Sequence, residues 1–146
     1  MPTKTSNYTD ASQAVQAHLG IMQNVIQRMA SNSTSCKAWC IALVSGLLVV
    51  VADKGKPEYA WLAAMPTALF LVLDAYYLAL ERAFRASYNR FIDKLHHGRV
   101  AAADLYAVEP VGSLPRLFLG ALVSFSVWPL YLTLLAMIWL AKQFVL

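Results

Sequence analysis

The sequence has few charged residues, and this shortage excludes an ordinary soluble domain. Only 14% of its 146 residues are charged, whereas 59% are hydrophobic. Soluble domains typically have about 25% charged and about 45–50% apolar residues. The apolar residues gather in three long runs with the charges between them. This pattern predicts an all-α chain that forms an integral membrane helical bundle.

The sequence also lacks the residue patterns that catalysis requires. Neither the phosphate-binding GxxxxGK[ST] pattern nor the zinc-protease HExxH pattern occurs in it. Ser45, Ser124 and Ser126 have no paired base in a recognisable arrangement. We therefore expect no enzymatic activity and no cofactor.

Metal ligands and disulfides are similarly scarce. The two cysteines, Cys36 and Cys40, are four residues apart, a spacing on a helix that suits neither a disulfide nor a zinc site. The adjacent histidines His96 and His97 have no third ligand placed with them. We expect the cysteines to be small apolar packing residues and predict no metal site.

The charge that is present lies mostly beside the apolar runs. The net charge is only +4, and positive residues in such places set topology and contact anionic headgroups. We therefore expect membrane lipids as partners and no nucleic acid. The first 32 residues have no continuous apolar core, so we expect insertion through internal spans and not through a signal peptide.

The first predicted element is an amphipathic helix over residues 10–32. Asp10 is its expected N-cap, with Gln13 three residues later. Its apolar residues recur at steps of four and three, which suits packing on another helix or on a copy in a neighbouring subunit. Lying on the membrane surface is the alternative, and the polar residues 31–35 should end the helix. The stripe for oligomerisation consists of Val15, Leu19, Met22, Ile26 and Met29.

Residues 33–80 are predicted to form a transmembrane hairpin. The uncharged run 38–52 is short, but an extension towards its N-terminal side brings it near the ~20 residues that a crossing needs. A compact turn at 53–57 makes the two flanking helices antiparallel neighbours. The second span should begin near residue 58 and run to about residue 80.

The helical pattern continues beyond the second span to Gly98, a predicted C-cap. Residues 81–116 should therefore form a cytoplasmic helix and a connector, with a short helix near 101–106. A third span is predicted over 117–141, which holds no charged residue and in which Pro129 should introduce a kink. If only this segment spans, the first two would form a buried hairpin of a soluble domain.

The positive-inside rule sets the expected orientation. Residues 81–116 are rich in Lys and Arg, whereas the two lysines of the turn at 53–58 are balanced by two acids. The N-terminus and residues 81–116 should therefore be cytoplasmic.

A carboxylate within a predicted span is the sharpest candidate for function. Asp74 is costly inside a bilayer and normally faces a bundle interior or water. It begins a polar stripe that would line a subunit interface or an aqueous path. The alternative is that Asp74 lies near the cytoplasmic end of its span, where water, Arg28 or Lys37 satisfies it. The stripe consists of Asp74, Tyr77, Glu81 and Arg85.

The projecting helix is also expected to meet a cytoplasmic protein partner. Its cations and aromatic rings follow at helical spacing, although the aromatic residues also suit simple packing. The predicted partner face consists of Arg85, Tyr88, Arg90, Phe91 and Lys94.

Two segments carry a resemblance to known proteins: residues 22–33 (MQNVIQRMASNS) with 36–39 (CKAW), and residues 73–85 (LDAYYLALERAFR). Both resemble small bacterial membrane proteins similar to the SLATT-type effectors of anti-phage systems. They are also similar to the membrane accessory proteins of RADAR and some CRISPR systems. The resemblance covers residues 13–95 and has the same order of leading helix, membrane hairpin and long cytoplasmic helix. It implies a homo-oligomer in the bacterial inner membrane, which perturbs that membrane when a cytoplasmic protein partner from a defence operon signals infection.

Three functions follow from these observations. The first is an oligomeric effector or accessory protein of bacterial defence that forms a pore or depolarises the membrane. The second is a membrane anchor whose cytoplasmic helix recruits a soluble complex. The third is a small ion channel or transporter with a path through Asp74.

Overall fold

The computed structural model describes residues 8–144. Over this range the chain is helical and contains no strand, which confirms the predicted all-α class. The elements in order are α1 (Gln13–Lys54), η1 (Pro57–Ala63), α2 (Ala64–His96), η2 (Ala102–Asp104), α3 (Leu114–Leu122) and α4 (Trp128–Phe144).

The helix α1 is continuous through the segment where the sequence predicted a break. Residues 31–35 remain helical, so the division into a leading helix at 10–32 and a separate span is wrong. The polar side chains of this segment find partners without unwinding the backbone. The Thr34 hydroxyl donates to the carbonyl of Ala30 at 3.2 Å, and Ser33 bonds across to α2. A Thr hydroxyl that bonds the carbonyl four residues earlier leaves the helical backbone intact, and a bond to another helix does not compete for the backbone.

The ends of α1 also differ partly from prediction. Its N-cap is Ser12, whereas Asp10 accepts a hydrogen bond from the adjacent Ala11 N–H at 3.0 Å. Gly55 ends the helix with φ of 58°, a left-handed conformation that glycine adopts without strain. The second span begins as the 3₁₀ helix η1 before it becomes α2, and Pro57 occupies its first turn.

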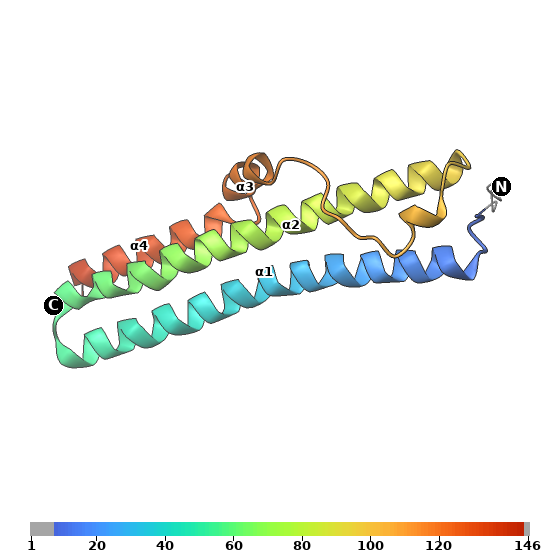
Figure 1. Ribbon diagram of the computed structural model, residues 1–146. Coiled ribbons are helices and arrows are strands. Elements are labelled where there is room, and N and C mark those ends of the chain that lie inside the picture. Colours follow the sequence, from blue (N-terminus) through green and yellow to red (C-terminus); the bar gives the residue numbers. More distant parts are fainter. Residues whose placement is uncertain (1–7, 145–146) are drawn as a thin grey trace.

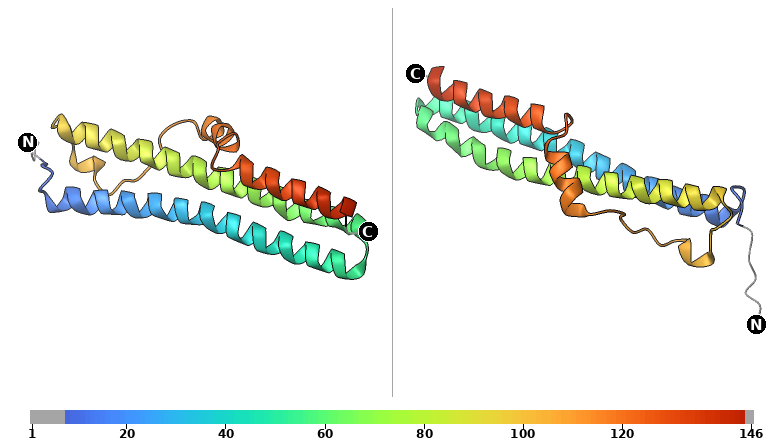
Figure 2. Two further views of the ribbon diagram at one scale, coloured as in Figure 1. Left: turned by 180° about the vertical axis from the view of Figure 1, so that it is seen from behind. Right: turned by 90° about the horizontal axis from the view of Figure 1, so that it is seen from above.

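Two long antiparallel helices form the frame of the molecule. Figure 1 shows α1 and α2 side by side along their length, with the tight turn at one end and the start of α1 at the other. The short helix α4 lies along the end nearest the turn, on which both views of Figure 2 agree. We call the end made by residues 38–80 and α4 the apolar half, and the end made by residues 8–36 and 81–112 the polar half.

Each half has its own core. In the apolar half, Tyr131, Leu134 and Ile138 of α4 are buried against Cys40 and Val44 of α1. In the polar half, a smaller cluster joins α1 to α2 and to the connector. Its buried members are Val15, Met22 and Phe91.

The third apolar segment is two helices and not the single span predicted over 117–141. In Figure 1, α3 lies across the bundle while α4 runs parallel to it. The chain turns between them at residues 123–127, where the N–H groups of Val127 and Trp128 donate to the Ser124 carbonyl at 2.9 and 3.2 Å. Pro129 lies in the first turn of α4, where its missing N–H costs nothing. The proline therefore marks a helix start, and the predicted kink is wrong.

Two helices are long and apolar enough to cross a membrane: α1, and the continuous segment η1–α2. Only 22% and 28% of their most apolar stretches are buried within the chain, whereas the core helices of a soluble protein are mostly buried. The 42 residues of α1 correspond to about 60 Å, twice the thickness of the hydrocarbon core. The 17 residues of α4 correspond to about 26 Å, near the lower limit for a crossing.

Candidate functional site

A buried ion pair joins α1 to α2 where the apolar and polar halves meet. The Lys37 ammonium lies 2.7 Å from Oδ1 of Asp74 and donates to the Ser33 hydroxyl at 3.0 Å. The Ser33 hydroxyl donates to the same Asp74 oxygen. Asp74 is completely buried, whereas 22% of the Lys37 side chain is exposed. Of the partners considered from the sequence, Lys37 is therefore the one that neutralises this carboxylate.

The second oxygen of Asp74 has no hydrogen-bond partner among the described residues. The Tyr131 hydroxyl is a neighbour of the carboxylate but donates instead to the carbonyl of Phe70 at 3.0 Å. This bond fixes α4 to α2 close to the ion pair. The helices α1, α2 and α4 therefore meet around Asp74.

The predicted polar stripe is not a continuous path. Asp74 points into the bundle towards α1, whereas Tyr77 is only half-buried. Glu81 and Arg85 form the expected ion pair at 2.8 Å, but 62% of the Arg85 side chain is exposed. The stripe thus runs from the interior of the bundle at Asp74 to the protein surface at Arg85. The two residues lie at different levels along the same straight helix.

The N-terminal part of the heptad-spaced stripe of α1, Val15, Leu19 and Met22, is used within the chain, whereas Ile26 and Met29 are half-buried. Val15 and Met22 are buried and pack with Phe91 of α2, so they are not free to contact another copy. Phe91 is itself only 5% exposed and therefore cannot belong to a partner face. At these α1 positions the helix packs on another helix of the same chain.

The connector folds back over the polar half as a strap, by which we mean residues 99–112 (Figures 1 and 2). Asp104 binds the Lys94 ammonium at 2.6 Å and accepts from the N–H of Ala101 at 2.9 Å. The N–H of Tyr106 donates to Nδ1 of His18 on α1 at 3.0 Å. The strap is therefore tied to both long helices.

His18 is the buried polar residue that sequence reasoning missed. Only 1% of it is exposed, and its ring lies 4.4 Å from the ring of Phe91. Burial lowers the pKa of His18, and the Asp104 carboxylate opposes this effect. The Lys94 ammonium lowers the pKa of Asp104. The sequence spacing does indicate that His18 is buried, because it lies three residues after Val15 and four before Met22, on the buried stripe.

The remaining candidates lie apart from these contacts. His97 pairs with Asp93 at 3.3 Å on the surface, and Cys36 and Cys40 are buried free thiols. Within residues 8–144, no group of three or more His, Cys, Asp or Glu side chains is placed to hold a metal ion.

Comparisons of the chain with protein-family models, with curated proteins and with solved structures give no match. Function must therefore be argued from the residues and their geometry. Two features stand out: a buried charged junction at Lys37 and Asp74, and a strap-covered polar half built around His18.

Proposed function

We propose that this chain is a membrane effector or accessory protein of bacterial anti-phage defence, which assembles with copies of itself in the inner membrane and perturbs it. The observation that carries the proposal is the large apolar surface left uncovered on the apolar half. Fewer than three in ten residues of the most apolar stretches of α1 and η1–α2 are buried by the chain itself. Lipid and neighbouring copies are the surroundings that suit such a surface.

The packed interior of the apolar half favours action by several copies over action by one. Val44, Val127 and Ile138 fill the space between the helices. Asp74 is held by Lys37 and does not face an open channel. Residues 8–144 of a single chain therefore offer no polar path, and membrane perturbation would need a path or a defect between copies. This also argues against a transporter that works through Asp74.

The outer face of α2 supports assembly better than the stripe of α1. Met65, Leu69, Val72 and Tyr76 are between 46% and 73% exposed and recur at steps of four, three and four residues. Such spacing keeps side chains on one helical face and suits contact with a second helix. We propose that copies meet along this row, which we call the outer row of α2.

The polar half fits a cytoplasmic position. It carries the cations Arg85, Arg90 and Lys94, which the positive-inside rule assigns to the cytoplasm. Because α1 and α2 run without a break from one half to the other, movement of the polar half would be transmitted directly to the apolar half.

Disulfide cross-linking in membranes tests the assembly. Cys36 and Cys40 would first be replaced by Ala, and a single cysteine placed at Leu69 or Val72. We expect oxidation to yield a covalent dimer from these positions. The matched control is Leu132→Cys on the exposed face of α4, 58% exposed, which should yield little dimer. Equal yields at all three positions would mean random collision, and no dimer at Leu69 or Val72 would remove the proposed contact.

A membrane anchor is the second candidate, supported by the exposure of Arg85 and Arg90 on α2. Replacing both by Glu should release a bound cytoplasmic protein and leave the membrane potential unaffected if anchoring is the function. Retention of the partner after this charge reversal would count against the anchor.

A further inference from the structure

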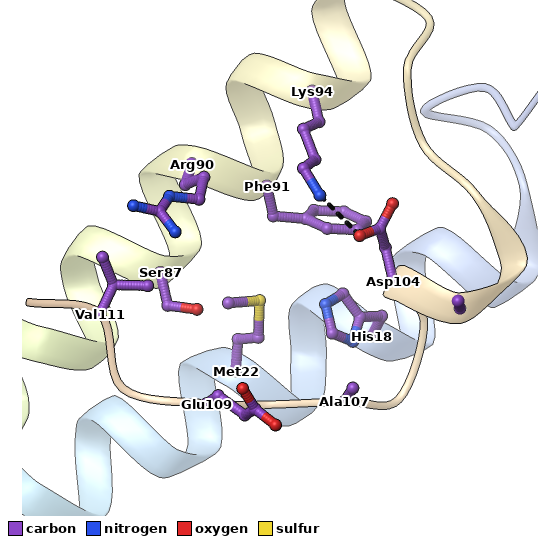
Figure 3. A pocket seen from close by; sticks show the side chains of 11 residues that line it. His18, Met22, Ser87, Arg90, Phe91, Lys94, Asp104, Ala107, Glu109 and Val111 are labelled. Atoms are coloured by element: carbon purple, nitrogen blue, oxygen red, sulfur yellow. Dashed lines mark hydrogen bonds and ion pairs between the residues drawn. The ribbon is translucent and has the colours of Figure 1, made fainter.

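A cavity of about 300 Å³ lies in the polar half, between the strap and the two long helices. Figure 3 shows it from close by, with side chains from α1, α2 and the strap around it. Its volume matches the lower end of the range for small-molecule sites, about 300–1,000 Å³. The residues that matter for recognition are His18, Met22, Ser87, Arg90, Phe91 and Glu109.

The wall formed by His18 offers a hydrogen-bond donor. The Tyr106 N–H donates to Nδ1, so the proton of the neutral ring is on Nε2. His18 lines the cavity, and Asp74 Oδ2 is the buried side-chain atom left without a partner among the described residues, so Nε2 is not a closed-off orphan. Nε2 can therefore donate to a ligand atom that accepts a hydrogen bond in the cavity.

The wall formed by α2 adds further donors. Ser87 and Arg90 are three residues apart and both line the cavity. Figure 3 shows them on the side opposite His18, with Met22 between. Arg90 forms no ion pair within residues 8–144, and a free guanidinium binds carboxylate or phosphate through two parallel hydrogen bonds.

The acids around the cavity limit how much negative charge it accepts. Asp104 is neutralised by Lys94 at 2.6 Å, so these two charges cancel. Glu109 on the strap faces the cavity and would repel a second anionic group. The apolar surface between the polar walls comes from Met22 and Phe91.

We propose that this cavity binds a small organic acid, which is a carboxylate or a phosphate with one anionic group and an apolar body. Arg90 and Ser87 hold the anionic group, Met22 and Phe91 contact the body, and Nε2 of His18 donates to a further acceptor. The inference is independent of membrane assembly, because every residue involved lies in the polar half of one chain.

Methionine-methyl NMR of the purified protein in detergent tests the site directly. Four of the five methionines lie within residues 8–144: Met22 lines the cavity, Met29 lies outside it on the same helix, and Met65 and Met137 are exposed in the apolar half. The probes are 3-phenylpropionate, phenyl phosphate, the neutral 3-phenylpropanol, and pyrophosphate. We expect the first two to shift the Met22 signal, while Met29, Met65 and Met137 stay in place.

Variants then identify the groups that bind. Arg90→Gln should weaken binding of the anionic probes by about tenfold or more, and Arg90→Lys should restore part of it. His18→Phe keeps an aromatic ring beside Phe91 but removes the donor, so it should also weaken binding. The matched control is Arg85→Gln on the same helix and outside the cavity, which should bind as the unaltered protein does.

Several results would overturn the proposal. One is the absence of any Met22 shift with both organic acids up to on the order of 10 mM. Another is equal binding of the neutral alcohol or of pyrophosphate, which would contradict the stated charge. Binding lost in Arg85→Gln but kept in Arg90→Gln would place the ligand in the neighbouring hollow beside Gln23 and Tyr88. Shifts of Met65 and Met137 alone would mean partition into detergent.

Discussion

Lys37 and Asp74 are 37 residues apart in the chain and pair inside the bundle, with 2.7 Å between Nζ and Oδ1. The pair locks α1 to α2 at the level where the apolar half begins. Because Asp74 is fully buried, its charge is stabilised mainly by this one cation and by Ser33. The pair therefore sets the register of the two long helices.

Removing only the cation should damage the protein more than removing both charges. Lys37→Met leaves the Asp74 carboxylate buried without a counter-ion, and we expect a loss of about 3–5 kcal/mol in the free energy of unfolding. The double variant Lys37→Met/Asp74→Leu should recover most of that loss. Unfolding in mixed micelles with increasing SDS measures both. A single variant as stable as the unaltered chain would show that the pair does not hold the helices together.

The tie between His18 and the strap should depend on pH. Burial lowers the pKa of His18 below its ordinary value of 6.5, so below that pH the unfolded chain binds more protons than the folded chain. Stability must then fall as the pH drops from 6.5 through the lowered pKa. Protonation of Nδ1 also removes the acceptor for the Tyr106 N–H, so the strap should loosen over the same range.

Hydrogen exchange of the Tyr106 amide measures this loosening, after correction for the intrinsic pH dependence of exchange. The Val111 amide, which donates to the Ala83 carbonyl at 3.2 Å, is the internal reference. His18→Gln should abolish the increase in Tyr106 amide exchange at low pH. Asp104 has its pKa lowered below 3.8 by Lys94, so its own contribution is lost only in stronger acid. If the exchange of the Tyr106 amide still increases at low pH in His18→Gln, another group causes the pH dependence.

The turn between α3 and α4 should depend on Arg82. Its guanidinium donates to the Ser124 hydroxyl at 2.9 Å and holds the turn against α2. A double-mutant cycle with Arg82→Gln and Ser124→Ala should give a coupling energy of about 1 kcal/mol. Arg116→Gln, an exposed arginine in the first turn of α3, is the matched control and should not couple to Ser124→Ala. If the effects of Arg82→Gln and Ser124→Ala are additive, the hydrogen bond between these residues does not contribute to the free energy of unfolding.

Composition and periodicity were enough to predict the helical class, the antiparallel hairpin and the long extension of α2, because each depends on local pattern. They failed where a side chain found its partner in another element. Within residues 31–35, which stay helical, Ser33 bonds to Asp74, a partner that no local rule reveals. At the break at 123–127, Ser124 bonds to Arg82, 42 residues away, whereas hydropathy alone makes residues 117–141 look like one span.

The candidate site was predicted only in part for the same reason. A carboxylate in an apolar run is conspicuous, so the sequence identifies Asp74, but it leaves water, Arg28 and Lys37 open as its partners. The role of His18 was missed, because its acceptor function depends on Tyr106, 88 residues away. Phe91 was assigned to an exposed face because helical spacing gives direction but does not reveal which neighbour covers it.

The central claim is that copies of this chain assemble through the outer row of α2 and perturb the membrane. Its most direct test is the membrane potential of bacteria that overproduce the protein, read with a voltage-sensitive dye at matched membrane abundance. The unaltered chain and Leu132→Trp on α4 should both depolarise the cells, whereas Val72→Trp, which obstructs the outer row, should not. A full membrane potential with the unaltered chain, or depolarisation that Val72→Trp leaves unchanged, would contradict the account.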